Sequence, residues 1–215
     1  MSKLTTIIIT ALAFYGTAYA NDVYIDQAGS SSNIDITQTG SGNRVGSSSE
    51  RTTILGTGGD DIDITQTGSS NEIDIETGSA ASSQNIDIIQ DGSNNIVDIN
   101  MGSVADAEID LNIDGDSNTV GICGTLTTAA GAGTAAVCNA DMAQDDFGVD
   151  VDVTGNGNQI GIARSSVGTA GVTEVTLDVT GASNYVNVVQ ETAGIVNMTI
   201  DGSSNGVNIT QSPSP

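Results

Sequence analysis

The sequence predicts an all-β fold, a β-solenoid of about seven or eight strand-arc-strand repeats with cross-β-like stacking. Three observations indicate it: aliphatic residues alternate with polar ones over short runs, a Gly-x-x-Asn corner recurs between these runs, and the corners are nearly evenly spaced. Alternation of period two is typical of strands, because successive side chains point to opposite faces. The 27 glycines and the many β-branched residues disfavour helices.

Residues 1–20, called the leader below, are typical of a cleaved secretory signal peptide. Lys3 supplies a positive start, a short apolar run follows, and Ala18-Tyr19-Ala20 is a small-x-small cleavage site. The apolar run is shorter than the roughly 20 residues that a membrane-spanning helix needs. We therefore expect the mature chain to begin at Asn21 and to be secreted, outside the cell or at the cell surface.

The chain is strongly acidic, with four basic residues against 27 acidic ones and a formal net charge of −23. Loss of Lys3 with the leader leaves only arginines as basic side chains. Nucleic acids and anionic membranes are bound through basic side chains that neutralise phosphates, so we expect neither as a partner. The charge suits a chain that must stay soluble until it reaches its assembly site.

One repeat unit organises the sequence. Its clearest copy, residues 62–75, reads Ile-Asp-Ile-Thr-Gln-Thr-Gly-Ser-Ser-Asn-Glu-Ile-Asp-Ile, and residues 86–99 form a second copy. Successive corner glycines stand 28, 24, 23, 40, 26 and 21 residues apart, which fits a unit of about 22 residues with insertions. An immunoglobulin-like sandwich has a similar density of strands but no reason to repeat this corner. A looser copy is expected at Gln27 and Gly29.

The insertions define the domain organisation. The largest is rich in Ala, Gly and Thr and carries both cysteines, Cys123 and Cys138. In an exported chain such a pair predicts a disulfide, and closing a loop of about 15 residues would stabilise the fold by roughly 3 kcal/mol. The chain divides into the leader (1–20), N-terminal repeats (21–122), the insertion (123–148), C-terminal repeats (149–211) and a tail (212–215).

Alternation assigns each side chain of a repeat to one face. Ile62 and Ile64 share a face with Gln66, whereas Asp63 takes the opposite face. Turning the aliphatic set inward gives a thin dry core, and the corner Gly fits an arc position with positive φ. We expect Asn71 to turn inward and to bond its counterpart one turn away, as amide ladders do in cross-β structures.

The residues assigned to the ladders and arcs share these corner positions. They are Gln38, Gly40, Asn43, Gln66, Gly68, Asn71, Gln90, Gly92, Asn95, Gly115, Asn118, Gly155, Asn158, Gly181, Asn184, Gln190, Gly202, Asn205 and Gln211.

These motifs resemble curlin, the repeat protein of bacterial curli fibres, whose motif is Ser-x5-Gln-x4-Asn-x5-Gln with a Gly usually two residues after the first Gln. Gln27 and Gln38 stand eleven residues apart, which is the Gln-to-Gln distance of that motif. The first Gln is replaced by Ile or Val in the later repeats, and the opening Ser is mostly absent. The first half of the motif is matched by residues 66–71 and 90–95, and the second half by Asn184 with Gln190 and Asn205 with Gln211.

The resemblance implies a structural subunit of an extracellular, amyloid-like fibre that serves adhesion and the biofilm matrix. It implies a homopolymer, a nucleator subunit and an outer-membrane secretion pore as partners. Curlins carry a segment between leader and repeats that addresses this pore, whereas here a strand-like stretch begins almost at once at Val23. The alternative function is a monomeric secreted β-solenoid, an adhesin or an ice- or surface-binding protein.

We do not expect an enzyme. The chain has no His, so acid–base or nucleophilic catalysis would rest on carboxylates or cysteines alone. A carboxylate glycosidase is the one enzymatic alternative, and no catalytic, cofactor-binding or metal-binding residue is assigned. The strand aspartates are expected to face outward and to be solvated: Asp63, Asp74, Asp87, Asp98, Asp110 and Asp178.

Two interpretations of these outward aspartates remain open. Stacking would bring like charges to about 5 Å, at a cost of roughly 1 kcal/mol per pair in a water-like dielectric. Either divalent cations such as Ca²⁺ relieve the repulsion and control assembly, or the charged face only keeps the chain soluble. Regular Thr-x-Thr rows would favour ice binding, but the pair Thr65 and Thr67 does not persist through the repeats.

Overall fold

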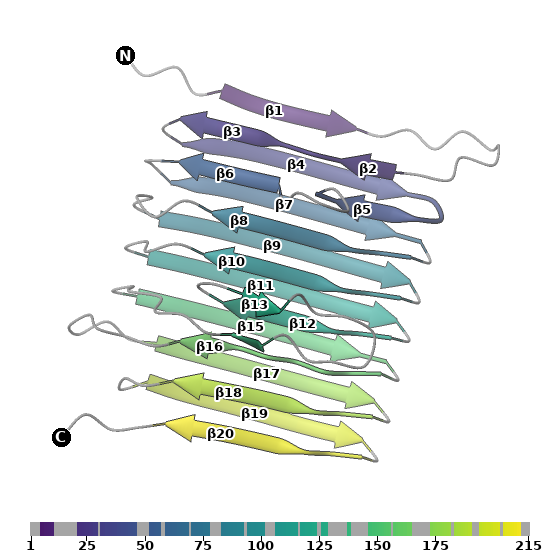
Figure 1. Cartoon of the computed structure of the whole chain (residues 1–215), viewed down its shortest axis with the longest axis vertical. Coiled ribbons are helices and arrows are strands. Elements are labelled where there is room, and N and C mark those ends of the chain that lie inside the picture. Colours follow the sequence, from purple (N-terminus) through teal and green to yellow (C-terminus); the bar gives the residue numbers. More distant parts are fainter. Residues whose placement is uncertain are drawn as a thin grey trace.

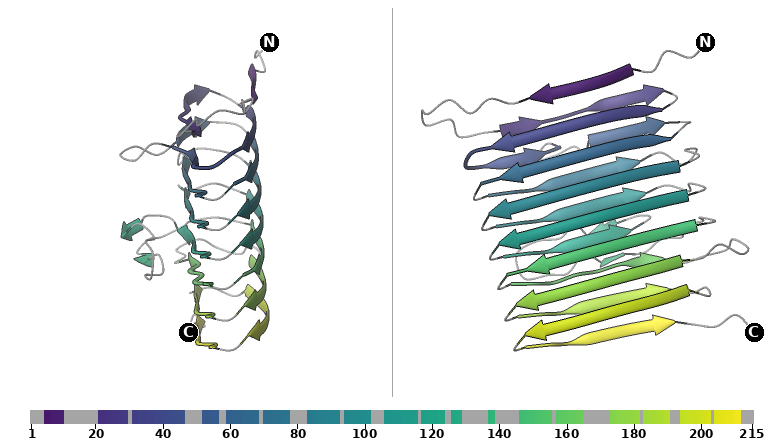
Figure 2. Two further views of the ribbon diagram at one scale, coloured as in Figure 1. Left: turned by 90° about the vertical axis from the view of Figure 1, so that its right-hand side faces the viewer. Right: turned by 180° about the vertical axis from the view of Figure 1, so that it is seen from behind.

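The computed structural model is a parallel β-solenoid in which two sheets face each other as two layers (Figures 1 and 2). In the part described, every regular element is a strand and no helix occurs, which confirms the predicted fold class. The structure describes residues 5–10, 21–29, 31–46, 52–56, 59–68, 70–77, 83–92, 94–101, 106–115, 117–123, 126–128, 137–138, 146–155, 157–164, 173–181, 183–190, 194–202 and 204–211.

Sheet A is an eight-stranded parallel sheet whose strands follow the order of the chain. Between two neighbouring strands of sheet A the chain crosses to the opposite layer and returns, so each circuit is one rung of the solenoid. The strands are β1 (Thr5–Thr10), β4 (Ser32–Thr39), β7 (Asp60–Thr67), β9 (Ser83–Gly92), β11 (Asp106–Gly115), β15 (Asp146–Thr154), β17 (Thr173–Gly181) and β19 (Gly194–Gly202).

Sheet B is the opposite layer, made of a seven-stranded and a three-stranded part. Backbone hydrogen bonds link the two parts, from Val120 N to Gln159 O and from Gly161 N to Val120 O. Its strands are β2 (Asn21–Val23), β3 (Asp26–Gly29), β5 (Asn43–Val45), β6 (Thr52–Gly56), β8 (Ile73–Thr77), β10 (Val97–Met101), β12 (Val120–Cys123), β16 (Ala163–Arg164), β18 (Val186–Gln190) and β20 (Val207–Gln211).

The register between strands aligns the aliphatic residues in columns that run along the solenoid. In sheet A, Ile34 pairs with Ile62, and Ile62 with Ile86; in sheet B, Ile75 pairs with Ile99. These side chains are at most 1% exposed, as the alternation predicts. Each such burial stabilises the fold by about 1.5–3 kcal/mol, and a one-residue slip would turn the whole column outward.

The strands of the two layers differ in length, which the sequence did not predict. Sheet A strands such as β9 and β11 have ten residues, whereas sheet B strands such as β8 and β10 have five. Alternation in sheet A continues upstream of the Ile triplet into polar residues that are also buried, among them Asp60 and Gln84. The short aliphatic runs from which the strands were predicted therefore omit the beginning of each sheet A strand.

The looser copy predicted at Gln27 and Gly29 is wrong. Both residues belong to β3 in sheet B, and Gln27 pairs with Ile54 instead of joining the strand position of Gln38 in sheet A. The eleven-residue spacing therefore joins two different positions of the rung, Gln27 in sheet B and Gln38 in sheet A. Two matching residues without an Asn three positions after the Gly do not define a corner.

The insertion contains a small antiparallel pair, β13 (Leu126–Thr128) and β14 (Val137–Cys138), which stands off the sheet B side of the solenoid (Figure 2). Strand β15 begins at Asp146, so the last three residues assigned to the insertion already belong to the C-terminal repeats. The side chains of Cys123 and Cys138 lie outside the described part, and the disulfide stays a prediction. So does cleavage of the leader, of which only the backbone of β1 is described.

One aspartate predicted to be solvated is buried. Asp98 lies on β10 between Asp74 of β8 and Gly121 of β12 in the register of sheet B, and it is 3% exposed. The chain continues from β12 into the insertion, whose strand β14 lies next to β12 on this part of the solenoid. Alternation assigns Asp98 to the outer face, but it does not encode how far that face is covered.

Candidate functional site

The corners of the solenoid form a continuous column of asparagines, the Asn ladder. Each member from Asn71 onward donates a hydrogen bond from its Nδ2 to the Oδ1 of the member one rung before it, at 2.6–3.2 Å. Six of the seven members are at most 3% exposed. Satisfied amide pairs in a dry core fix the stacking register, because an unpaired amide would be costly there. The members are Asn43, Asn71, Asn95, Asn118, Asn158, Asn184 and Asn205.

The corner positions require glycine for a steric reason that the sequence reveals only in part. Four of them, Gly40, Gly68, Gly92 and Gly155, have φ between 145° and 155°, as predicted. The remaining three do not, yet from Gly68 to Gly202 a Cβ at any corner glycine would approach the carbonyl oxygen of the preceding corner glycine far closer than the 3.0 Å limit of real contacts. Close stacking of the corners thus excludes every side chain.

Glutamines extend the polar column in the N-terminal rungs. Gln38, Gln66 and Gln90 are aligned by the register and are at most 1% exposed. Gln90 Nε2 donates to Gln66 Oε1 at 3.1 Å, and Gln38 Nε2 donates to the carbonyl oxygen of Arg44 at 2.6 Å across the corner. From β11 onward an aliphatic residue, first Ile113, takes this position. The Gln column therefore reaches only half of the solenoid.

The second predicted glutamine pair lies in sheet B. Gln190 and Gln211 are register partners at the ends of β18 and β20; their side chains lie outside the described part. The structure thus brings the predicted residues together as three separate columns along the solenoid: the Asn ladder, the Gln column of sheet A and this short Gln pair. None of them surrounds a cleft.

The two ends of the solenoid differ in burial. At the N-terminal end β1 pairs with β4, and Ile34 and Ile36 of β4 are 1% and 2% exposed. At the C-terminal end, Val207 and Ile209 of β20 are 50% and 44% exposed, whereas their register partners Val186 and Val188 are fully buried. The C-terminal rung therefore presents its apolar inner surface and two edge strands, β19 and β20.

The outer face of sheet A carries a column of five aspartates on successive strands: Asp35, Asp63, Asp87, Asp110 and Asp150. Burial raises the pKa of Asp63, Asp87 and Asp150 above its ordinary value, and repulsion from neighbouring carboxylates raises it further. The charged column opposes folding at neutral pH.

Acidification should therefore stabilise the fold. The pKa of these aspartates is higher in the folded chain than the value of about 3.9 in the unfolded chain. Their protonation therefore contributes its full stabilisation of the fold below about pH 3.9, and this contribution is lost as the pH rises through the folded pKa. We expect a higher urea midpoint at pH 4 than at pH 7, followed by circular dichroism at fixed ionic strength. The double variant Asp63→Asn/Asp87→Asn should show a weaker dependence, and a midpoint that falls on acidification would contradict the expectation.

The fold and its columns define a class of protein, a two-layer parallel β-solenoid with an amide ladder at its corners. Comparison of the chain with protein-family models, curated proteins and solved structures finds no match. Within the described ranges, no helix is long and apolar enough to cross a membrane. The resemblance to curlin thus stays a prediction from the motifs.

Proposed function

We propose that this chain is a structural subunit that stacks end to end into an extracellular, curli-like fibre. The exposed C-terminal rung is the observation that carries the proposal: among the described strands β19 and β20 are the last of their sheets, and the inner side chains of β20 are exposed. Unpaired strand edges are templates for another strand of matching pattern. A further copy would extend the same columns of Ile, Val and Asn.

The opposite end supplies the complementary surface. If the leader is removed as the sequence predicts, β1 leaves and β4 becomes the edge strand of sheet A. The N-terminal end would then offer Ile34 and Ile36 to the C-terminal rung of the next copy, whose Val196 and Met198 are already partly exposed. Aliphatic columns of like register on both ends favour growth in one head-to-tail direction.

Ice binding finds less support. The exposed Thr37 and Thr65 are register partners, but the column continues with Ile89 and then Asn112. Beyond the leader, the array of threonines thus ends after two rungs. The monomeric binder remains the competing outcome of the experiment below.

The proposal is tested with the purified chain beginning at Asn21. We expect incubation to give a Thioflavin T signal with a lag that preformed seeds remove, fibres in electron micrographs, and a 4.7–4.8 Å cross-β reflection. The same samples are followed by size-exclusion chromatography. A β-rich chain that stays monomeric over the whole incubation would refute the fibre and favour the binder.

A further inference from the structure

Three polar side chains form a buried column where the strands of sheet A begin. Asp60 of β7 and Gln84 of β9 are register partners, and Asp60 Oδ1 accepts a hydrogen bond from Ser32 N of β4 at 2.9 Å. The exposed fractions of Ser32, Asp60 and Gln84 are 2%, 2% and 3%. Ala107 of β11 continues the column and ends it with a methyl group. The aliphatic pattern does not reveal these three residues, although each stands two positions before an inward Ile.

The column has unsatisfied polar atoms. Ser32 Oγ, Asp60 Oδ2 and both amide atoms of Gln84 have no hydrogen-bond partner. Buried polar groups normally have partners, and a buried carboxylate normally has a compensating charge. In the described ranges a salt bridge joins Arg44 to Glu72, and no basic side chain forms a salt bridge with Asp60. Ser32 Oγ, Asp60 Oδ2 and Gln84 Oε1 are therefore oxygen atoms that can serve as ligands of a cation.

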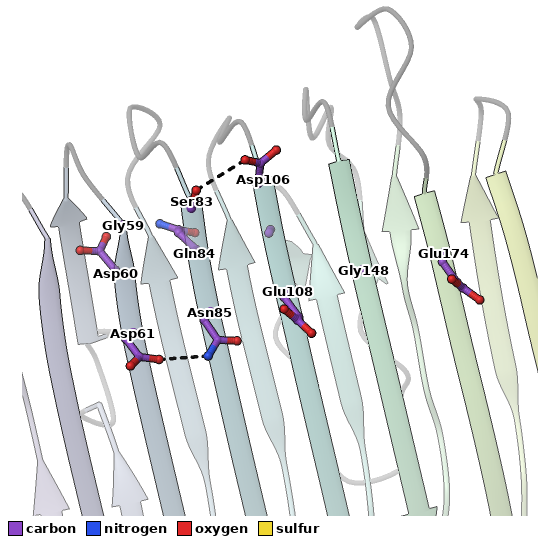
Figure 3. A pocket seen from close by; sticks show the side chains of 11 residues that line it. Gly59, Asp60, Asp61, Ser83, Gln84, Asn85, Asp106, Glu108, Gly148 and Glu174 are labelled. Carbon is purple, nitrogen blue, oxygen red and sulfur yellow. Dashed lines mark hydrogen bonds between the residues drawn. The ribbon is translucent and has the colours of Figure 1, made fainter.

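Asp60 and Gln84 also line a groove of about 640 Å³ that runs across the beginnings of β7, β9, β11, β15 and β17 (Figure 3). Two pairs of its outward side chains bond each other: Asp61 accepts from Asn85 Nδ2 at 3.0 Å, and Asp106 accepts from Ser83 Oγ at 3.5 Å. The carboxylates of the lining would raise the local concentration of cations. The unsatisfied oxygens of Asp60 and Gln84 therefore lie beside an acidic entrance.

We propose that Asp60 Oδ2, Gln84 Oε1 and Ser32 Oγ bind a hard cation, Ca²⁺, which enters from this groove. Carboxylate and amide oxygens with water are the ligands of Ca²⁺, whose coordination is flexible. Mg²⁺ demands a stricter octahedron and gives up water reluctantly, which a narrow buried column disfavours. Within the described ranges, no three His, Cys, Asp or Glu side chains gather around a common point. The site thus depends on a single carboxylate.

The proposal is tested by Ca²⁺ binding to the folded chain from Asn21 in equilibrium dialysis with radioactive Ca²⁺ at fixed ionic strength. We expect one site, bound more tightly than Mg²⁺, and a dissociation constant raised about tenfold or more in Asp60→Asn. The control is Asp63→Asn, which removes the same charge from the exposed face of the same strand and should bind as the parent does. Absence of Ca²⁺ binding, or equal binding by Asp60→Asn and the parent, overturns the site.

A second variant keeps the test decisive where Asp60→Asn fails to fold. Gln84→Glu places another carboxylate beside Asp60; at a cation site it should tighten Ca²⁺ binding, and Ca²⁺ should raise its melting temperature more than that of the parent. At a polar cluster without a cation, the second buried charge would only lower the melting temperature, and Ca²⁺ would not restore it. That result overturns the proposal. Neither readout requires fibres, so the site and the proposed function can fail separately.

Discussion

Gly115→Ala is expected to lower the free energy of unfolding by about 3 kcal/mol or more, the upper range for overpacking a closed site. Gly115 ends β11, and a Cβ there would overlap the carbonyl oxygen of Gly92 and the Oδ1 of Asn95. The first is a backbone atom, and the second is held by Asn118 in the Asn ladder. Neither neighbour can move without separating two rungs. Urea unfolding followed by circular dichroism measures the loss.

Gly148→Ala is the matched control for this substitution. Gly148 lies on β15, the next strand of sheet A, and a Cβ there would meet only the carbonyl oxygen of Ala107 at 3.9 Å. Alanine is favoured over glycine in a strand through the entropy of the unfolded chain, so this variant should be unchanged or more stable by about 0.5–1 kcal/mol. If both variants lost the same stability, close stacking of the corners would not be the reason for glycine.

The fold could be predicted because its signals are local and repeated. The alternation at Ile62 and Ile64 gives the inward face, and the same pattern at each corner gives the stacking, since identical units can share one register. The bond between Asn71 and Asn43 follows from this register, because equivalent residues of successive rungs lie next to each other. A single Gln-x-Gly without the following Asn, as at Gln27, carries no such signal.

What could not be predicted depends on contacts between different parts of the rung. Asp98 occupies an outward position and is still buried, which alternation alone does not encode. Asp60 and Gln84 were not identified as inward residues, since alternation is recognised by its aliphatic members. The candidate cation site consists of inward positions that this criterion overlooks.

The end of the solenoid gives the other large expected effect. Ile209→Lys should slow fibre elongation by more than about tenfold, because burying this side chain against the next copy is worth about 1.5–3 kcal/mol and a factor of ten in rate corresponds to about 1.4 kcal/mol. Ile209 is 44% exposed in the isolated chain, while its register partner Val188 is fully buried. A lysine here would place a charge on the inner surface of the next rung. Elongation is measured by Thioflavin T in seeded reactions.

Lysine is chosen instead of aspartate because it reduces the net negative charge of the chain, and the weaker repulsion between copies cannot by itself slow growth. Ile89→Lys is the matched control, since Ile89 is 47% exposed on the outer face of sheet A, away from both ends. It makes the same chemical change on a surface that stacking leaves free, and it should elongate as the parent chain does. Equal slowing of the two variants would contradict a growing surface at the C-terminal rung, whereas slowing of Ile209→Lys alone would support it.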